Sequence, residues 1–234
     1  MKELVIISGK GGTGKTSITA SFAALAAAPV LADCDVDAAD LHLVLSPEIE
    51  RSETFTSGHT ARIRPDDCTG CGVCETVCRF DAVFGFTVDP LLCEGCGACV
   101  EFCPANAIDF ISRDCGEWYC SSTRNGPMVH ARMKPGAENS GKLVSLVRSE
   151  ARKLGEEMAC DILLVDGPPG IGCPVIASVT GADAVLVVTE PTLSGEHDLK
   201  RVLDLVGHFK IPAAVCVNKW DINEAMTRQI EALA

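Results

Sequence analysis

The segment Gly9-Lys10-Gly11-Gly12-Thr13-Gly14-Lys15-Thr16 decides the fold of this 234-residue chain. An apolar run, residues 2–8, precedes it and predicts a buried parallel strand; an Ala-rich stretch, 17–28, follows it and predicts a helix. The segment satisfies the P-loop pattern G-x-x-x-x-G-K-[ST]. Its glycines let backbone amides turn toward phosphate oxygens. We expect residues Gly9 to Ser17 to bind a nucleotide, with Lys15 at the β- and γ-phosphates and Thr16 on Mg²⁺.

Apolar runs and helical stretches alternate on both sides of the P-loop. The predicted strands lie at 29–33, 161–165, 184–188 and 213–217, and the predicted helices near 36–45, 142–158, 174–180, 194–208 and 222–234. This alternation predicts an α/β fold with a parallel sheet and helices on both faces, as in P-loop NTPases. Residues 114–141 show no clear period, and we expect a long loop there.

Two further segments follow predicted strands and belong with the P-loop. The run Ile162-Leu163-Leu164-Val165-Asp166 is an apolar strand that ends in an acid, the Walker B pattern, which places Asp166 on Mg²⁺. Glycines and prolines at 167–170 favour a mobile switch loop. Asn218-Lys219-Trp220-Asp221 follows the last strand and matches the N-K-x-D pattern that reads a nucleotide base.

A cysteine-rich region, residues 55–113, interrupts the α/β pattern. Eight of the fourteen cysteines stand in two matching copies with the spacing C-x2-C-x2-C-x3-C, offset by 25 residues. This is the spacing of bacterial two-cluster ferredoxins, in which the fourth cysteine serves the other cluster. We expect two [4Fe–4S] clusters; the alternatives are zinc, which prefers separated pairs, and disulfides. The ligands would be Cys68, Cys71, Cys74 and Cys103 for cluster 1, and Cys93, Cys96, Cys99 and Cys78 for cluster 2.

The segment KGGTGKT resembles the deviant Walker A motif of the MinD/ParA/Mrp superfamily, and nearly the whole chain resembles members with an inserted ferredoxin domain. The resemblance implies that Lys10 crosses a dimer interface to the partner's nucleotide, so that Lys10, Lys15 and Asp35 are catalytic. It implies that Asp35 positions the attacking water and that Asp33 supports Mg²⁺. Asp37 is an alternative for the water, and it fits a helix N-cap equally well.

The resemblance also bears on the base and on a third cluster. Relatives with this motif mostly use ATP and place an Asn against adenine, so we favour ATP over GTP, with Asn218 and Asp221 near the base. The nitrogenase iron protein of this superfamily bridges its subunits with a cluster on a Cys placed like Cys173. Asn139 stands where the second such Cys would be, so we do not expect a bridging cluster here.

These observations predict an organisation and a function. Residues 1–54 and 114–234 would form the ATPase domain, C-terminally shortened, and residues 55–113 the inserted ferredoxin domain. We expect a cytoplasmic, Mg²⁺-dependent ATPase that couples nucleotide state to electron transfer; the alternative is an ATP-dependent assembly or carrier factor for iron–sulfur or other metal cofactors. We expect a nucleotide-dependent homodimer, or related heterodimer, and a redox or metallocofactor protein partner. A net charge of -12 argues against nucleic acid as a partner. We expect no stable membrane anchor, because no apolar run approaches the length of a membrane span.

Overall fold

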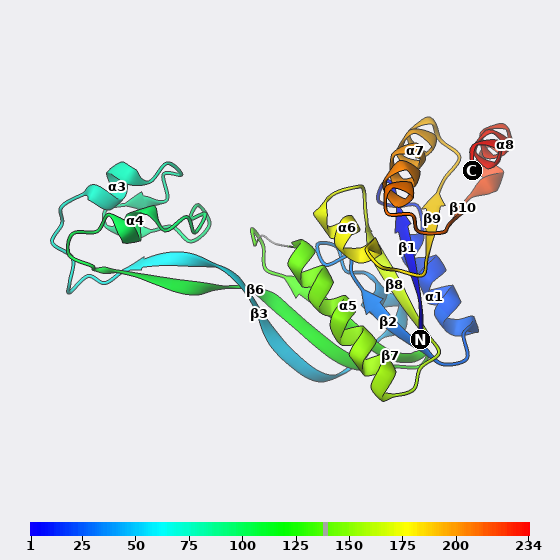
Figure 1. Cartoon of the computed structure of the whole chain (residues 1–234), viewed down its shortest axis with the longest axis horizontal. Helices are drawn as coiled ribbons and strands as arrows, with labels where there is room; N and C mark the ends of the chain where they lie inside the picture. Colours follow the sequence, from blue (N-terminus) through cyan, green and yellow to red (C-terminus); the bar gives the residue numbers. More distant parts are fainter. Residues whose placement is uncertain (138–139) are drawn as a thin grey trace. The chain divides into compact units, whose positions relative to one another are not determined.

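The computed structural model describes residues 1–137 and 140–234, and its elements alternate between strand and helix (Figure 1). In chain order they are β1 (Lys2–Ser8), α1 (Lys15–Leu25), β2 (Pro29–Asp33), α2 (Leu41–Leu45), β3 (Glu48–Ile63), α3 (Val73–Val77), β4 (Val83–Phe84), β5 (Thr87–Val88), α4 (Ala98–Glu101), β6 (Ile108–Thr123), β7 (Gly126–Met133), α5 (Ser140–Glu157), β8 (Ile162–Pro169), α6 (Cys173–Val179), β9 (Ala184–Thr189), α7 (Leu193–His208), β10 (Ala213–Val217), η1 (Trp220–Ile222) and α8 (Glu224–Leu233). Asn139 lies outside the described residues.

The chain divides into two compact units. Unit 1 holds Met1–Glu53, Glu117–Met133 and the C-terminal part of the chain through Ala234. Unit 2 holds Thr54–Gly116 and a short piece that begins at Lys134. The residues expected to form an inserted domain, 55–113, all lie within unit 2, and strands β3 and β6 each contribute residues to both units.

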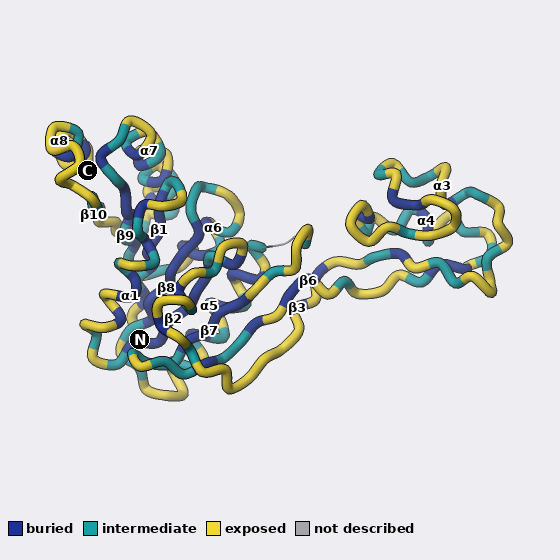
Figure 2. The backbone as a smooth tube through the Cα atoms, turned by 180° about the vertical axis from the view of Figure 1, so that it is seen from behind, coloured by how far each residue is buried: buried dark blue, intermediate teal, exposed yellow. Residues whose placement is uncertain are grey.

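The main sheet has eight strands in the order β10-β9-β1-β8-β2-β7-β6-β3. The pairs β10–β9, β9–β1, β1–β8, β8–β2 and β2–β7 are parallel, as the alternating pattern predicted. The central strands are largely buried because helices cover both faces, as the dark blue of β1 shows (Figure 2). Val5, Ile6 and Ile7 of β1 are fully buried. Parallel strands end at one edge of the sheet, so the loops after β1, β2 and β8 meet there.

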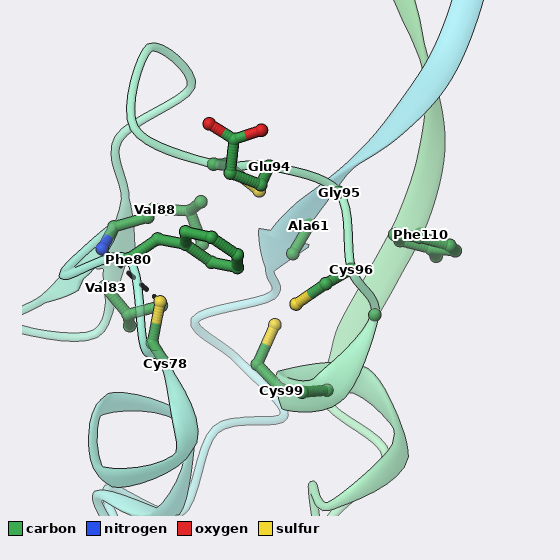
Figure 3. A pocket seen from close by; sticks show the side chains of 14 residues that line it. Ala61, Cys78, Phe80, Val83, Val88, Glu94, Gly95, Cys96, Cys99 and Phe110 are labelled. Atoms are coloured by element: carbon green, nitrogen blue, oxygen red, sulfur yellow. Dashed lines mark hydrogen bonds between the residues drawn. The ribbon is translucent and has the colours of Figure 1, made fainter.

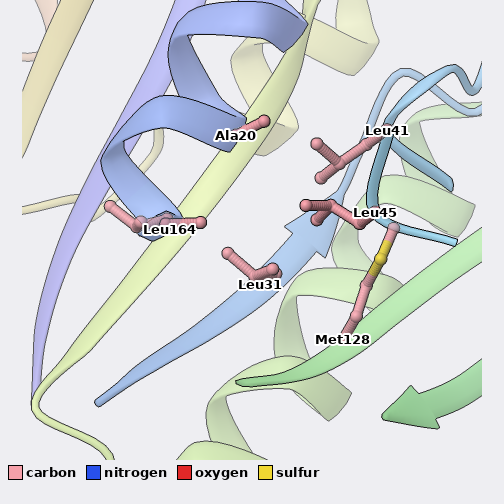
Figure 4. Packing of buried hydrophobic residues seen from close by; sticks show 7 residues of the cluster. Ala20, Leu31, Leu41, Leu45, Met128 and Leu164 are labelled. Carbon is pink, nitrogen blue, oxygen red and sulfur yellow. The ribbon is translucent and has the colours of Figure 1, made fainter. Parts of the chain in front are cut away.

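The two faces of this sheet are covered by different helices. Ala20 and Ala23 of α1 pack with Leu31 of β2 and Leu164 of β8 in one cluster, which α2 and Met128 of β7 complete (Figure 4). The preceding residue of β2, Val30, points to the opposite face, where it lies against Gly155 of α5. Because successive side chains of a strand alternate between faces, α1 and α5 flank the sheet as layers.

Unit 2 is built around its two cysteine repeats. Short helices α3 and α4 begin after Gly72 and Gly97, whose φ values of 74° and 76° lie in the left-handed region that glycine adopts at little cost. Its core contains Ala61, Ala82, Val83 and Ile108 together with buried cysteines of both repeats. Strands β4 and β5 form a small antiparallel sheet.

The expectation of a long loop at 114–141 is wrong. Most of that stretch is strand, because β6 runs to Thr123 and β7 spans Gly126–Met133. Asn125-Gly126 at the turn is a strong signal for a hairpin. The loop prediction rested on the Gly, Pro and polar content of the stretch and overlooked this signal. Gly126 has a φ of 131°, and a Cβ there would overlap the carbonyl oxygen of Pro29. Within the described part of the chain, no helix is long and apolar enough to span a bilayer.

Candidate nucleotide site and paired cysteine cavities

The P-loop lies between β1 and α1, at the carboxyl edge of the sheet. Helix α1 begins at Lys15, directly after Gly14, whose φ of 94° is left-handed. A Cβ at Gly14 would overlap the Asn218 side-chain amide, so the position requires glycine for both conformation and space. The P-loop amides at this helix start form the kind of positive end that binds phosphate.

Lys15 lies inside a cluster of carboxylates. Its Nζ is 3.1 Å from Asp35 Oδ2 and 3.6 Å from Asp166 Oδ1, and its side chain is only 7% exposed. Burial alone would lower the pKa of Lys15, but the charges of Asp166 and Asp35 raise it. Lys15 is therefore an ammonium held at the centre of the site, and the structure brings these three predicted residues together.

Asp166 is buried and only half satisfied. Thr19 donates from Oγ1 to Asp166 Oδ1 at 3.1 Å, whereas Asp166 Oδ2 has no hydrogen-bond partner among the described residues. Burial raises the pKa of Asp166, while Lys15 and the Thr16 hydroxyl work against that rise. Thr13 Oγ1 of the P-loop is likewise buried without a partner in the described chain. Orphaned buried oxygens of this kind suit a cation and a polar ligand.

Asp33 has a different environment from its neighbours in the acidic segment. Its two oxygens accept from the backbone N–H groups of Asp35 and Leu41, each at 3.2 Å. Burial, followed by the nearby charge of Asp166, raises the pKa of Asp33 well above its ordinary value. Asp33 therefore fixes the turn after β2 as well as adding charge beside Asp166. Asp37 instead lines a separate cavity with His42 and His130.

Lys10 is held by its own chain. Its Nζ lies 2.6 Å from Glu190 Oε1, 2.9 Å from Ser194 Oγ and 3.3 Å from Thr192 Oγ1. Glu190, which the sequence analysis did not single out, follows strand β9 and reaches the P-loop from there. Its position directly after an apolar strand was the available signal, because that is where α/β folds place site residues.

The Asn218-Lys219 segment contacts the P-loop backbone. Asn218 donates from Nδ2 to the Thr13 carbonyl at 2.8 Å, and Lys219 donates from Nζ to the Gly12 carbonyl at 2.9 Å. Lys219 also lies 2.9 Å from Glu190 Oε2. Asp221 is exposed in η1. The segment that was predicted to read the base thus supports the backbone of the P-loop, a role that its sequence pattern did not reveal.

The predicted cysteine sets line two separate cavities of unit 2. One is lined by Cys93, Cys96 and Cys99 of the second repeat and Cys78 of the first. Figure 3 shows the sulfur atoms of Cys96 and Cys99 pointing toward each other, with Cys78 on the other side of the cavity. Gly95 beside it has a φ of 63°, and a Cβ there would overlap the His59 carbonyl.

The other cavity has the reciprocal composition. It is lined by Cys68, Cys71 and Cys74 of the first repeat and Cys103 of the second. Each cavity is thus lined by three cysteines of one repeat and one cysteine of the other. The other lining residues are mostly apolar, with Phe86 and Ala107 among them.

The two exchanged cysteines receive matching hydrogen bonds. The Ala82 amide donates to Cys78 Sγ at 3.4 Å, and the Ala107 amide donates to Cys103 Sγ at 3.3 Å. Burial raises the pKa of the Cys99 thiol. All fourteen cysteines are free rather than disulfide-bonded. Among the residues that the structure describes, no three His, Cys, Asp or Glu side chains converge as ligands of a single metal ion.

Cys173 lines neither cavity. It is exposed and forms the first residue of α6, and a Cβ added at Gly141 would lie 3.5 Å from its backbone and Cβ. The second position considered for a bridging cluster, Asn139, falls outside the described residues.

Comparisons with known proteins agree with this geometry. The CbiA model, described as the CobQ/CobB/MinD/ParA nucleotide binding domain, matches residues 4–234. The chain belongs to this family. A similar relative is an uncharacterised protein of Methanocaldococcus jannaschii, 36% identical over 224 residues, which cover 94% of this chain and 79% of that protein. The matched residues include the P-loop, the acidic ends of β2 and β8, and the Asn218 segment.

Solved structures of MinD show the same fold. The Pyrococcus furiosus cell division ATPase MinD aligns with a TM-score of 0.54 and 18% identity, covering 98% of this chain and 79% of that chain. The septum site-determining protein MinD of Pyrococcus horikoshii, complexed with Mg-ADP, aligns with a TM-score of 0.54 and 17% identity, covering 98% of this chain and 76% of that chain. At this identity the likeness establishes a MinD-like α/β P-loop fold.

Proposed function

We propose that this chain is a Mg²⁺-dependent ATPase that carries two [4Fe–4S] clusters and whose nucleotide state controls electron transfer to a partner protein. The observation that carries the proposal is the sorting of eight cysteines into two four-cysteine cavities that exchange their fourth member. The compartment would be the reducing cytoplasm, where clustered cysteines stay free to bind metal.

The two cavities suit clusters better than single ions. A four-iron cubane takes one thiolate at each iron, so its ligands stand farther apart than four ligands around zinc. This accounts for four cysteines around each cavity without a group that fits one ion among the described residues. When bound, such clusters supply one-electron chemistry. The amides of Ala82 and Ala107 would tune their potential through hydrogen bonds to Cys78 and Cys103.

The residues around the P-loop suit Mg²⁺ and a nucleoside triphosphate. Thr16, Asp166 and, less directly, Asp33 would hold the metal. Oδ2 of Asp166, which has no hydrogen-bond partner among the described residues, would be the oxygen that binds it. Thr13 and the glycines of residues 9–14 would cradle the phosphates. Lys15 would neutralise them once its contacts with Asp35 and Asp166 loosen. Asp35, half-buried beside Lys15, is the candidate to orient water.

ATP is the nucleotide that we propose, with Asn218 and Asp221 facing the base. Lys10 would act across a nucleotide-dependent dimer, either of this chain with itself or with a related chain. Its ammonium would meet the phosphates of the opposite protomer, so hydrolysis would require dimerisation. The acidic surface of the chain favours a partner protein with a basic docking face.

Anaerobic redox titration of the full chain tests the proposal. We expect the midpoint potential of the clusters to differ between Mg-ATP and Mg-ADP, and we expect Lys15→Ala to retain the clusters while losing that difference. Identical midpoints with both nucleotides, in protein that binds them, would contradict nucleotide control. Transfer of all iron to an apo-acceptor upon ATP addition would instead support the assembly or carrier function.

A further inference from the structure

In the proposed function, Lys10 of the P-loop contacts the nucleotide of a partner protomer, but in this structure its ammonium group is bound by residues of its own chain. A lysine ammonium has three N–H donors, and three oxygens surround Lys10 Nζ, those of Glu190, Thr192 and Ser194. The Lys10 side chain is 29% exposed and that of Glu190 is 16% exposed, so the pair is partly shielded from water. An ion pair of this kind is stronger than one on the open surface.

Glu190 uses both of its oxygens on lysines of the nucleotide site. Oε1 pairs with Lys10, and Oε2 pairs with Lys219 at 2.9 Å. Hydrogen bonds from Lys10 and then from Lys219 hold the pKa of Glu190 below its ordinary value, so the carboxylate is charged at neutral pH. Lys219 in turn donates to the Gly12 carbonyl. One carboxylate thus ties two sides of the P-loop to the end of β9.

The neighbouring residues fix Glu190 in this position. Thr192 caps α7 by accepting from the Gly195 amide at 3.0 Å, which holds the short segment between β9 and α7. Gly9 packs against Asp198 of α7 so closely that a Cβ would overlap it. Lys10 and its three acceptors therefore belong to a packed junction rather than to a mobile surface.

We propose that Glu190 is an intramolecular latch that holds Lys10 in its own protomer and competes with the partner's nucleotide for it. This inference rests on the proposed role of Lys10 in the dimer and adds a residue that regulates it. Lys10 cannot satisfy a phosphate and Glu190 at once with the same donors, so dimer formation must break the Lys10–Glu190 pair. Glu190 sets the threshold for ATP-driven dimerisation and keeps the isolated protomer inactive.

Substitution of Glu190 by Gln tests the latch, because Gln keeps the shape and removes the charge. Glu196→Gln is the matched control: it lies on α7, pairs with Lys200 and Gln229, and forms no ion pair or side-chain hydrogen bond with the P-loop among the described residues. In nucleotide-free protein, amine acetylation followed by mass spectrometry should show Lys10 modified about 3- to 10-fold faster in Glu190→Gln, an increase expected from loss of one charged pair. Equal rates of Lys10 acetylation in Glu190→Gln and Glu196→Gln would contradict the proposal that Glu190 holds Lys10.

Dimerisation measured by analytical ultracentrifugation gives the second readout. The ATP concentration at half-dimerisation should fall several-fold in Glu190→Gln, stay unchanged in Glu196→Gln, and no dimer should form in the double variant Lys10→Ala, Glu190→Gln. If Glu190 only supports the P-loop, Glu190→Gln will weaken both ATP binding and dimerisation, which would contradict competition. A failure of the proposed function would appear separately, as absence of ATP binding by the unaltered chain, and the acetylation result does not depend on it.

Discussion

Thr19 donates from Oγ1 to one oxygen of the buried Asp166 carboxylate at 3.1 Å, and the other oxygen of Asp166 has no partner among the described residues. A buried, half-satisfied carboxylate is costly to keep charged, and it is the kind of group that a metal ion stabilises. The Asp166 charge therefore lowers the stability of the metal-free protein and at the same time allows Mg²⁺ to bind.

Asp166→Asn should separate these two properties. The amide keeps an acceptor for Thr19 and removes the buried charge, so the free energy of unfolding without Mg²⁺ and nucleotide should equal or exceed that of the unaltered chain. ATP hydrolysis should fall by about 100-fold or more because the metal loses its ligand. Thermal denaturation with and without Mg-ATP measures the stability and the ligand binding, and release of phosphate measures the hydrolysis. A large loss of stability in the metal-free protein would show that the Asp166 charge is structurally required.

The pH dependence of the same variant follows from the raised pKa of Asp166. A carboxyl whose folded pKa exceeds its unfolded value of 3.8 stabilises the fold below that value, and the contribution is lost as pH rises through the folded pKa. Without Mg²⁺, the unaltered chain should therefore lose stability relative to Asp166→Asn as the pH rises above the unfolded pKa of 3.8. A stability difference that stays constant with pH would contradict this assignment.

Gly14→Ala should abolish nucleotide binding. The φ of 94° is strained for alanine, and the added Cβ would displace the Asn218 amide from the loop. We expect a loss of roughly 1–3 kcal/mol in the free energy of unfolding. Gly207→Ala is the control, because nothing lies within 4 Å of a Cβ there and the position is helical; it should raise stability slightly. Normal nucleotide affinity in Gly14→Ala would refute the account of this turn.

His130 should make unit 1 acid-sensitive. Burial, and then the nearby His42, lower its pKa from 6.5 to about 4, and its Nε2 lies 2.9 Å from Ser121 Oγ. A base with a depressed folded pKa stabilises the fold above its unfolded pKa, and this contribution is lost as pH falls from 6.5 to about 4. We expect His130→Gln to remove roughly 2–3 kcal/mol of this pH dependence. The exposed His197→Gln should retain it; identical profiles for both variants would exclude His130.

The sequence predicted the features that have a fixed spacing or a regular pattern, and it did not predict the hairpin or the contacts between distant residues. The P-loop, Walker B strand and cysteine repeats carry fixed spacings, and the main parallel sheet follows from apolar strands alternating with helices. The β6–β7 hairpin was missed because its residues mix polar and apolar types and only the Asn125-Gly126 turn marks it. The Lys10–Glu190 contact joins residues far apart in sequence, which no local pattern encodes.

The exchange of the fourth cysteine can be tested with pairs of substitutions. Cys68→Ala with Cys103→Ala removes two ligands of one cavity, so the protein should keep about half of its iron. Cys99→Ala with Cys103→Ala removes ligands of both cavities and should leave almost none. Cys160→Ala, outside both cavities, should leave iron unchanged. Iron assays on folded protein decide this, and the reverse order of the two double variants would show that each repeat binds its own cluster.

The central claim is that these cavities hold iron–sulfur clusters, and the direct measurement is the iron and acid-labile sulfide content of anaerobically purified chain. We predict about eight irons and about eight sulfides per chain, with a brown colour that reduction bleaches. Folded protein that binds ATP but contains neither iron nor sulfide, or contains zinc in their place, would contradict the account.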